Sequence, residues 1–112
     1  MIVTEFYTKG EDSGMPNPSG AGWIVPTQAD RGWFYQNLVL GLLESGGSVG
    51  AHWFQYMDSN PAATNSDPSN IDSNKGVVNI QYARYDPLLD RMKLLNDDLY
   101  AIIGSMHDRG AP

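Results

Sequence analysis

The sequence has no cysteine, few basic residues and no long apolar run, and each of these absences argues against one class of function or structure. Without cysteine there is neither a disulfide framework nor thiolate chemistry. The seven Lys and Arg residues are scattered, which argues against a nucleic-acid partner. No apolar stretch approaches the roughly 18 residues of a membrane helix, so we expect no membrane span. Glutamate occurs only at Glu5, Glu11 and Glu44, which leaves few candidates for carboxylate catalysis.

What is present describes a small, acidic, loop-rich domain. The 112 residues are 41% hydrophobic, enough to bury a core, and the formal net charge is -6. Such a surface suits solubility and neutral ligands. Twelve glycines and seven prolines predict long ordered loops, and the three Trp, six Tyr and three Phe residues offer aromatic surfaces for ligands.

The first stretch predicts a buried strand that ends in an acid. Ile2, Val3 and Thr4 run into Glu5, and aromatic and polar residues follow up to Gly10. In parallel α/β proteins the carboxyl end of a strand is where ligands bind and chemistry occurs. Residues 11–26 are rich in Gly and Pro and predict a long loop, which we expect residues 23–25 to anchor.

Two helices and a second strand follow. Thr27 as N-cap, with Asp30 three residues on, predicts a helix that runs to about Glu44. Residues 48–56 (Ser-Val-Gly-Ala-His-Trp-Phe-Gln-Tyr) predict a strand, and residues 57–75 a second long loop. Asp86 as N-cap and Pro87 as the first helical residue open a helix with a regular apolar stripe that ends near Gly104; residues 105–112 should be frayed.

The order is therefore βαβα, an α/β fold with a parallel strand pair joined by a right-handed crossover. Both long loops follow strands, as in a (β/α) barrel that carries its site on its βα loops. Two strands leave both sheet edges unpaired. We therefore expect residues 1–104 to be a C-terminal portion of a (β/α)8 (TIM) barrel that needs the missing N-terminal βα units. A small autonomous domain, or a dimer that pairs the edges, is the alternative.

The sequence resembles the C-terminal part of the β-agarase and β-porphyranase glycoside hydrolases, which are retaining (β/α)8 enzymes that cut marine galactans. The resemblance spans most of the chain, in the same order, to about Tyr100. It is carried by Thr4-Glu5-Phe6-Tyr7-Thr8-Lys9-Gly10, by Thr27-Gln28-Ala29-Asp30-Arg31-Gly32 with Phe34-Tyr35-Gln36-Asn37, by His52-Trp53-Phe54-Gln55-Tyr56 and by Ser73-Asn74-Lys75-Gly76.

The resemblance implies that the two strands are the seventh and eighth of the barrel and that Glu5 is the nucleophile. It implies β-galactosidic hydrolysis of agarose or porphyran by double displacement, with no cofactor and a secreted or periplasmic location. Retaining hydrolysis needs a second carboxylate roughly 5–5.5 Å away. In these families that acid/base residue lies on strand four, which does not occur in this sequence.

Four aromatic residues are candidates for substrate contact. Tyr7 follows the nucleophile and could bind sugar or hold Glu5 ionised. Alternation places His52 and Tyr56 on one side of their strand and Trp53 on the other, so Trp53 either stacks on sugar or packs under a helix. Lys75 is either a contact for an anionic sugar substituent or a surface lysine.

The second long loop is rich in Asp and Asn, spaced in a way that suggests a calcium loop. The glutamate that would close such a loop is absent, so we expect no metal site and interpret these residues as turn and cap formers. Two non-enzymatic hypotheses are alternatives to the hydrolase: a carbohydrate-binding remnant that has lost catalysis, and a small structural α/β module.

Overall fold

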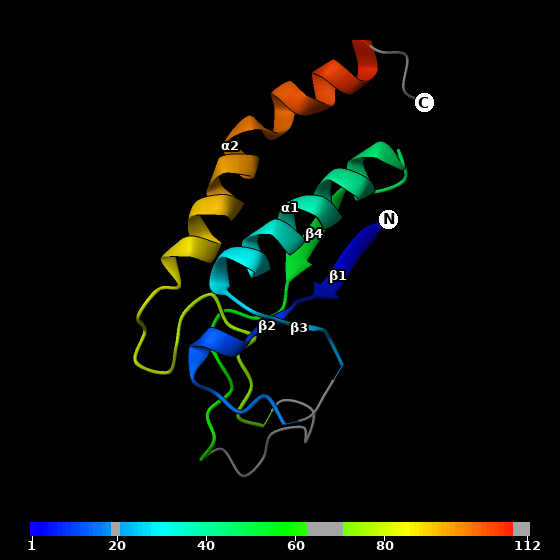
Figure 1. Cartoon of the computed structure of the whole chain (residues 1–112). Helices are drawn as coiled ribbons and strands as arrows, with labels where there is room; N and C mark the ends of the chain where they lie inside the picture. Colours follow the sequence, from blue (N-terminus) through cyan, green and yellow to red (C-terminus); the bar gives the residue numbers. More distant parts are fainter. Residues whose placement is uncertain (19–20, 63–70, 109–112) are drawn as a thin grey trace.

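A computed structural model of the chain describes residues 1–18, 21–62 and 71–108 (Figure 1). The predicted strand, helix, strand, helix order is confirmed. Its four main elements are β1 (Ile2–Phe6), α1 (Gln28–Glu44), β4 (Gly50–Trp53) and α2 (Asp86–Asp108). β1 and β4 pair in parallel, with Ile2 opposite Gly50 and Phe6 opposite Trp53, so α1 is the crossover between them.

The N-terminus of α1 forms as the sequence predicts. The Thr27 side chain accepts a hydrogen bond from the backbone N–H of Asp30, at 3.1 Å. The Asp30 carboxylate in turn accepts from the backbone N–H of Thr27, also at 3.1 Å. This capping box satisfies two amide groups that no helical carbonyl can reach.

Both helices cover the same face of the β1–β4 pair, and the core lies between them and the strands. Phe6, Val39 and Leu95, from β1, α1 and α2, form its buried centre. Figure 1 shows the two helices side by side along most of their length. Burial of this apolar surface is the main term that holds such a layered arrangement together.

The strands are shorter and more exposed than predicted. β4 spans Gly50–Trp53, whereas the sequence predicted a strand over residues 48–56. Three of the five side chains of β1 are exposed along with Met1 before it, so the predicted burial of this strand is wrong. The physical reason is that α1 and α2 lie on one face, and nothing in the described residues covers the other.

The long loop after β1 carries structure that the sequence did not predict. A two-residue strand β2 (Lys9–Gly10) pairs in parallel with β3 (Ile24–Val25), and a 3-10 turn η1 (Glu11–Ser13) lies between them. The expectation that residues 23–25 anchor the loop is met by this backbone pairing rather than by side chains, since Trp23 is 75% exposed. In Figure 1 this loop and the loop after β4 gather at the carboxyl ends of β1 and β4.

The last helix continues past the residue at which we predicted it to stop. α2 ends at Asp108, so Gly104 and residues 105–108 are helical rather than frayed; residues 109–112 lie outside the described part. Met106 is buried. Its burial stabilises the helical turn that follows Gly104 and so offsets the poor helix propensity of glycine. Within the described residues, neither helix is long and apolar enough to cross a membrane.

The packing of α2 against the rest of the chain includes Leu88, which is 0% exposed. Leu88→Ala is expected to lower the free energy of unfolding by about 2–5 kcal/mol, because it removes buried methyl groups and leaves a cavity. Leu94→Ala is the matched control on the same helix, since Leu94 is 63% exposed, and should change the value by less than about 0.5 kcal/mol. Urea unfolding of the full-length protein measures both; equal effects would contradict this packing.

Candidate functional site

Glu5 lies near the carboxyl end of β1, on the face that the helices leave uncovered. Val3 and Phe6 point toward the helices and pair with Ala51 and Trp53 of β4. The strand register shifts between Val3 and Phe6, and the two residues in between, Thr4 and Glu5, are both exposed. An irregularity of this kind re-aims side chains, and here it places two consecutive residues on the open face.

An open hollow of about 350 Å³ lies beside Glu5 and is lined by Glu5, Phe6, Tyr7, Ala21 and Gly22. Tyr7 is half-buried in its wall. The ammonium of Lys75 lies 4.3 Å from the centroid of the Tyr7 ring, and the Phe54 ring centroid lies 5.9 Å away. The structure thus brings the predicted nucleophile and one predicted substrate residue to the same hollow.

The three candidates from the second strand are not placed alike. His52 is exposed on β4, and alternation puts it on the opposite side of the strand from Trp53. Trp53 packs under α1, 5.5 Å from Phe6 and 6.4 Å from Tyr35 between ring centroids, and its indole N–H donates to the Lys75 carbonyl at 2.8 Å. This position favours the packing alternative for Trp53. Tyr56 lies beyond the end of β4 and is 65% exposed.

A buried guanidinium connects the elements behind the hollow. Arg31 of α1 is 0% exposed. Its Nε donates to the Thr8 carbonyl at 2.9 Å, and its two Nη atoms donate to Gln28 Oε1 at 2.6 Å and to the Gly76 carbonyl at 2.9 Å. The guanidinium also stacks on Trp53, 5.3 Å from its ring centroid. One side chain therefore joins the end of β1, the start of α1 and the loop before α2.

Asp58 and Asn74 extend this network across the second loop. Asp58 Oδ1 accepts from Asn74 Nδ2 at 2.9 Å and from the Gly76 N–H at 2.8 Å, and Oδ2 accepts from the Tyr85 hydroxyl. Asn74 Oδ1 accepts from the Gly10 N–H at 2.9 Å and from Gln28 Nε2 at 2.8 Å. These bonds hold the two long loops against each other and against the N-terminus of α1.

Burial governs the electrostatics of this network. Burial lowers the pKa of Arg31 to about 10, although Asp58, Tyr85 and Asp12 oppose the shift. Burial also raises the pKa of Asp58, against hydrogen bonds from Tyr85, Gly76 and Asn74 and the charge of Arg31. Both pKa shifts disfavour the charged form of the group. Arg31 and Asp58 are therefore desolvated, and their hydrogen bonds offset the cost of burying them.

Lys75 is 1% exposed, so it is not a surface lysine. The same burial keeps its ammonium out of contact with a sugar substituent. Lys9 is buried as well, at 2%, and burial together with the charge of Lys75 lowers its pKa. These lysines and Arg31 are three of the seven cationic residues of the chain. The predicted contact between Lys75 and an anionic sugar substituent is therefore not supported.

The loop rich in Asp and Asn forms turns and buried contacts. Asn60 Oδ1 accepts from the Ala62 N–H at 2.9 Å, which is the turn type that the sequence predicts. Asp67 and Asn70 lie outside the described residues. Among residues 1–18, 21–62 and 71–108, no group of three or more His, Cys, Asp or Glu side chains could hold a metal ion.

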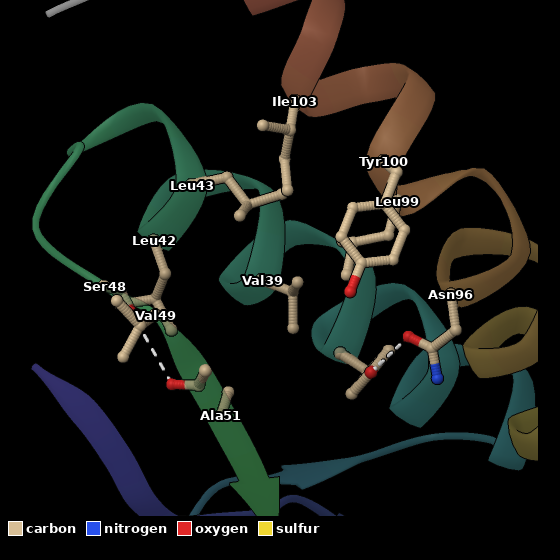
Figure 2. A pocket seen from close by; sticks show the side chains of 12 residues that line it. Val39, Leu42, Leu43, Ser48, Val49, Ala51, Asn96, Leu99, Tyr100 and Ile103 are labelled. Atoms are coloured by element: carbon tan, nitrogen blue, oxygen red, sulfur yellow. Dashed lines mark hydrogen bonds between the residues drawn. The ribbon is translucent and has the colours of Figure 1, made fainter.

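A larger groove lies elsewhere, between the C-terminal halves of α1 and α2 and the start of β4 (Figure 2). It has a volume of about 570 Å³. Figure 2 shows its walls converging from both helices and from β4: Val39, Leu42, Leu43, Ser48, Val49, Ala51, Asn96, Leu99, Tyr100 and Ile103. Among the described residues that line it there is no carboxylate, imidazole or cation, which are the groups that hydrolysis needs.

The sequence alone did not single out Arg31, Asp58 or Gly22 as parts of the site. Arg31 belonged to a segment that carried the resemblance, but a helical arginine is usually exposed, and no local pattern shows that it is buried. Asp58 belongs to the loop whose Asp and Asn residues the sequence predicts to form turns and caps. Gly22 has a positive φ of 89°, and the only signal for it was its place in a Gly-rich loop.

The chain is similar in sequence to Beta-agarase B of Vibrio sp. (strain JT0107), with 36% identity over 103 residues. The match covers 90% of this chain and 10% of that agarase. No protein-family model matches the sequence.

The chain is also similar to parts of solved structures. BpGH50 superimposes with a TM-score of 0.80 at 40% identity, covering 93% of this chain and 20% of that one. An exo-β-agarase gives 0.74 at 31% identity, covering 88% and 13%. The chain spans between 10% and 20% of the lengths of these relatives. It matches one small α/β part of much larger proteins.

The Arg31 network gives a stability test with a matched control. Arg31→Lys keeps the charge but cannot make the three forked hydrogen bonds, so it is expected to lower the free energy of unfolding by about 2–4 kcal/mol. Arg84→Lys alters an exposed arginine paired with Asp86, where less than about 0.5 kcal/mol is expected. Urea unfolding of the full-length protein compares the two. Similar small losses would show that the network contributes little.

Asp58 gives a pH test. Its folded pKa is raised above the ordinary 3.8, so its contribution to stability is fully present below that pH and is lost as the pH rises through the raised value. Asp58→Asn removes this titration. Stability relative to that variant is therefore expected to fall as the pH rises from 3.8 toward neutrality. Thermal unfolding of both proteins at several pH values measures the difference, and a rise with pH would contradict the sign.

Proposed function

We propose that this chain supplies the nucleophile half of the active site of a retaining galactan hydrolase of agarase type. The observation that carries the proposal is the position of Glu5, exposed near the carboxyl end of β1 beside the hollow that Tyr7 lines. The similarity to β-agarases over nearly the whole chain supports it. The proposal follows the rule that parallel barrels carry their chemistry at the carboxyl ends of their strands.

The chemistry needs two carboxylates with different roles. In the first step a Glu5 carboxylate oxygen bonds to the anomeric carbon while the glycosidic C–O bond breaks, and a second carboxylic acid gives its proton to the leaving oxygen. In the second step that group takes a proton from water, the water oxygen bonds to the anomeric carbon, and Glu5 departs. Glu5 is the only carboxylate among the described residues that line the hollow.

The second carboxylate would come from a larger (β/α)8 barrel in which β1 and β4 are neighbouring strands. A two-stranded parallel sheet leaves unpaired backbone groups at both edges, which further strands would satisfy. The groove of Figure 2 is an apolar surface at the β4 edge, with Val49 82% exposed and Tyr100 85% exposed. Its occupant in this proposal is a further βα unit of the same barrel, consistent with relatives several times longer.

A neutral galactan fits this half of the site better than a sulfated one. A sulfate ester needs a cation within reach, and Lys9, Arg31 and Lys75 are all buried behind the hollow. Arg84 and Lys93 are engaged by Asp86 and Asp97 on α2. With a net charge of -6, the chain disfavours anionic polymers, so agarose is the proposed substrate rather than porphyran.

The absence of a second carboxylate from the described lining of the hollow favours one alternative, a carbohydrate-binding remnant without catalysis. A remnant would keep Tyr7 and the exposed His52 for sugar contact and would never turn over agarose. Catalysis in the presence of a complete barrel separates the two functions.

The test is a hybrid enzyme in which this chain replaces the matching 103-residue segment of the Vibrio Beta-agarase B. The hybrid is expected to release reducing ends from agarose, because Glu5 would take the place of the nucleophile. Glu5→Gln in the hybrid should lower the rate by at least about 1,000-fold, since an amide cannot form the glycosyl–enzyme bond.

Two exposed glutamates serve as matched controls. Glu11→Gln and Glu44→Gln remove the same charge from η1 and from the end of α1, and each should leave the rate within about twofold of the parent. Near-normal turnover by the Glu5→Gln hybrid would overturn the nucleophile assignment. A correctly folded parent hybrid that binds agarose oligosaccharides without cleaving them would support the remnant instead.

A further inference from the structure

Gly22 makes an unusually close contact with the ring of Tyr7. A Cβ atom at position 22 would lie 2.4 Å from Cε2 and 2.9 Å from Cδ2 of that ring. Real Cβ atoms do not approach other atoms so closely, so any side chain at this position would displace the ring. Both residues line the hollow beside Glu5.

The backbone next to Gly22 is held in place. The Lys9 N–H donates to the carbonyl of Trp23 at 2.9 Å, and Lys9 pairs with Ile24 in the β2–β3 ladder. Lys9 lies two residues after Tyr7, and Trp23 directly follows Gly22. The short parallel ladder therefore fixes the spacing between the glycine and the aromatic ring, which a free loop could not do.

Other residues also constrain the Tyr7 ring. The Lys75 ammonium lies 4.3 Å from the ring centroid, and the Phe54 ring is tilted by 48° against it at 5.9 Å. Lys75 is 1% exposed, so this cation belongs to the support of the ring rather than to the hollow. The ammonium of Lys75 covers one face of the Tyr7 ring, so a sugar cannot stack on that face. Only the rest of the ring can contact substrate.

We infer that Gly22 is a positioning residue, which acts through Tyr7 to fix one wall of the sugar subsite beside Glu5. The inference rests on the proposed function and extends it from the nucleophile to a residue of the first loop. A wall set at a fixed place holds the reacting sugar carbon at the distance that attack by Glu5 requires. Displacement of the wall by about 1 Å can cost on the order of 100-fold in rate.

The chain contains a matched control for this contact. Gly14 has a φ of 78°, close to the 89° of Gly22, but a Cβ atom there would meet nothing within 4 Å. Gly14→Ala and Gly22→Ala therefore carry the same kind of backbone strain, and only Gly22→Ala collides with a ring. Tyr7→Ala removes the ring, so it should make room for a side chain at position 22.

The experiment measures kcat and KM of the hybrid enzyme on an agarose-derived hexasaccharide. Gly22→Ala is expected to lower kcat/KM by about 10- to 100-fold, with most of the loss in kcat, because the sugar still binds but is held wrongly. Gly14→Ala should stay within about twofold of the parent. In the Tyr7→Ala background, adding Gly22→Ala should cause no further loss, as expected for residues that act as one unit.

Two outcomes would overturn the inference while leaving the nucleophile in place. One is an active parent hybrid in which Gly22→Ala and Gly14→Ala behave alike. The other is a loss from Gly22→Ala that persists in full without the Tyr7 ring, which would assign the effect to the backbone. A folded parent hybrid that does not cleave agarose would instead overturn the proposed function and, with it, the subsite role of Tyr7.

Discussion

The buried guanidinium of Arg31 is the interaction on which the arrangement of this chain depends. It is the point at which β1, α1 and the loop before α2 meet, because its three hydrogen bonds end on Thr8, Gln28 and Gly76. A buried charge tolerates no missing partner, so each element must occupy its place before the guanidinium can be desolvated. Arg31 thus converts three separate segments into one cooperative unit at the carboxyl ends of the strands.

The candidate site takes its geometry from that unit. Thr8 receives a bond from Arg31 one residue after Tyr7 and three after Glu5, so the guanidinium fixes the backbone from which both side chains project. Gly76, also bonded to Arg31, directly follows Lys75, whose ammonium supports the Tyr7 ring. The Arg31 network therefore buries polar side chains behind the hollow and leaves Glu5 exposed in front of it. The hollow is supported by hydrogen-bonded loops rather than by a large apolar core.

The helices were predictable from the sequence, and most of the site was not. Thr27 and Asp30 are local signals that act within four residues, and the apolar stripe of α2 repeats with the helix period. The stop at Gly104 failed because Met106 is buried by tertiary packing, which no local pattern reports. Arg31, Asp58 and Lys75 occur in polar segments that are typical of a surface. Their burial follows from partners that are distant in sequence, such as Gly76 for Arg31, Asn74 for Asp58 and Tyr7 for Lys75. Glu5 is a candidate from the sequence because an apolar run that ends in an acid is a local pattern.

The open face of β1 and β4 links folding to function. Ile2 is 50% exposed on the strand that carries Glu5, and an apolar strand residue contributes little free energy until another layer covers it. In the proposed barrel the added strands would bury that residue and complete the backbone pairing at both edges. The same strands would bring the proton donor that Glu5 requires. Apolar burial and the pairing of two carboxylates would then be achieved by a single assembly step, so a chain that lacks the added strands would lack both.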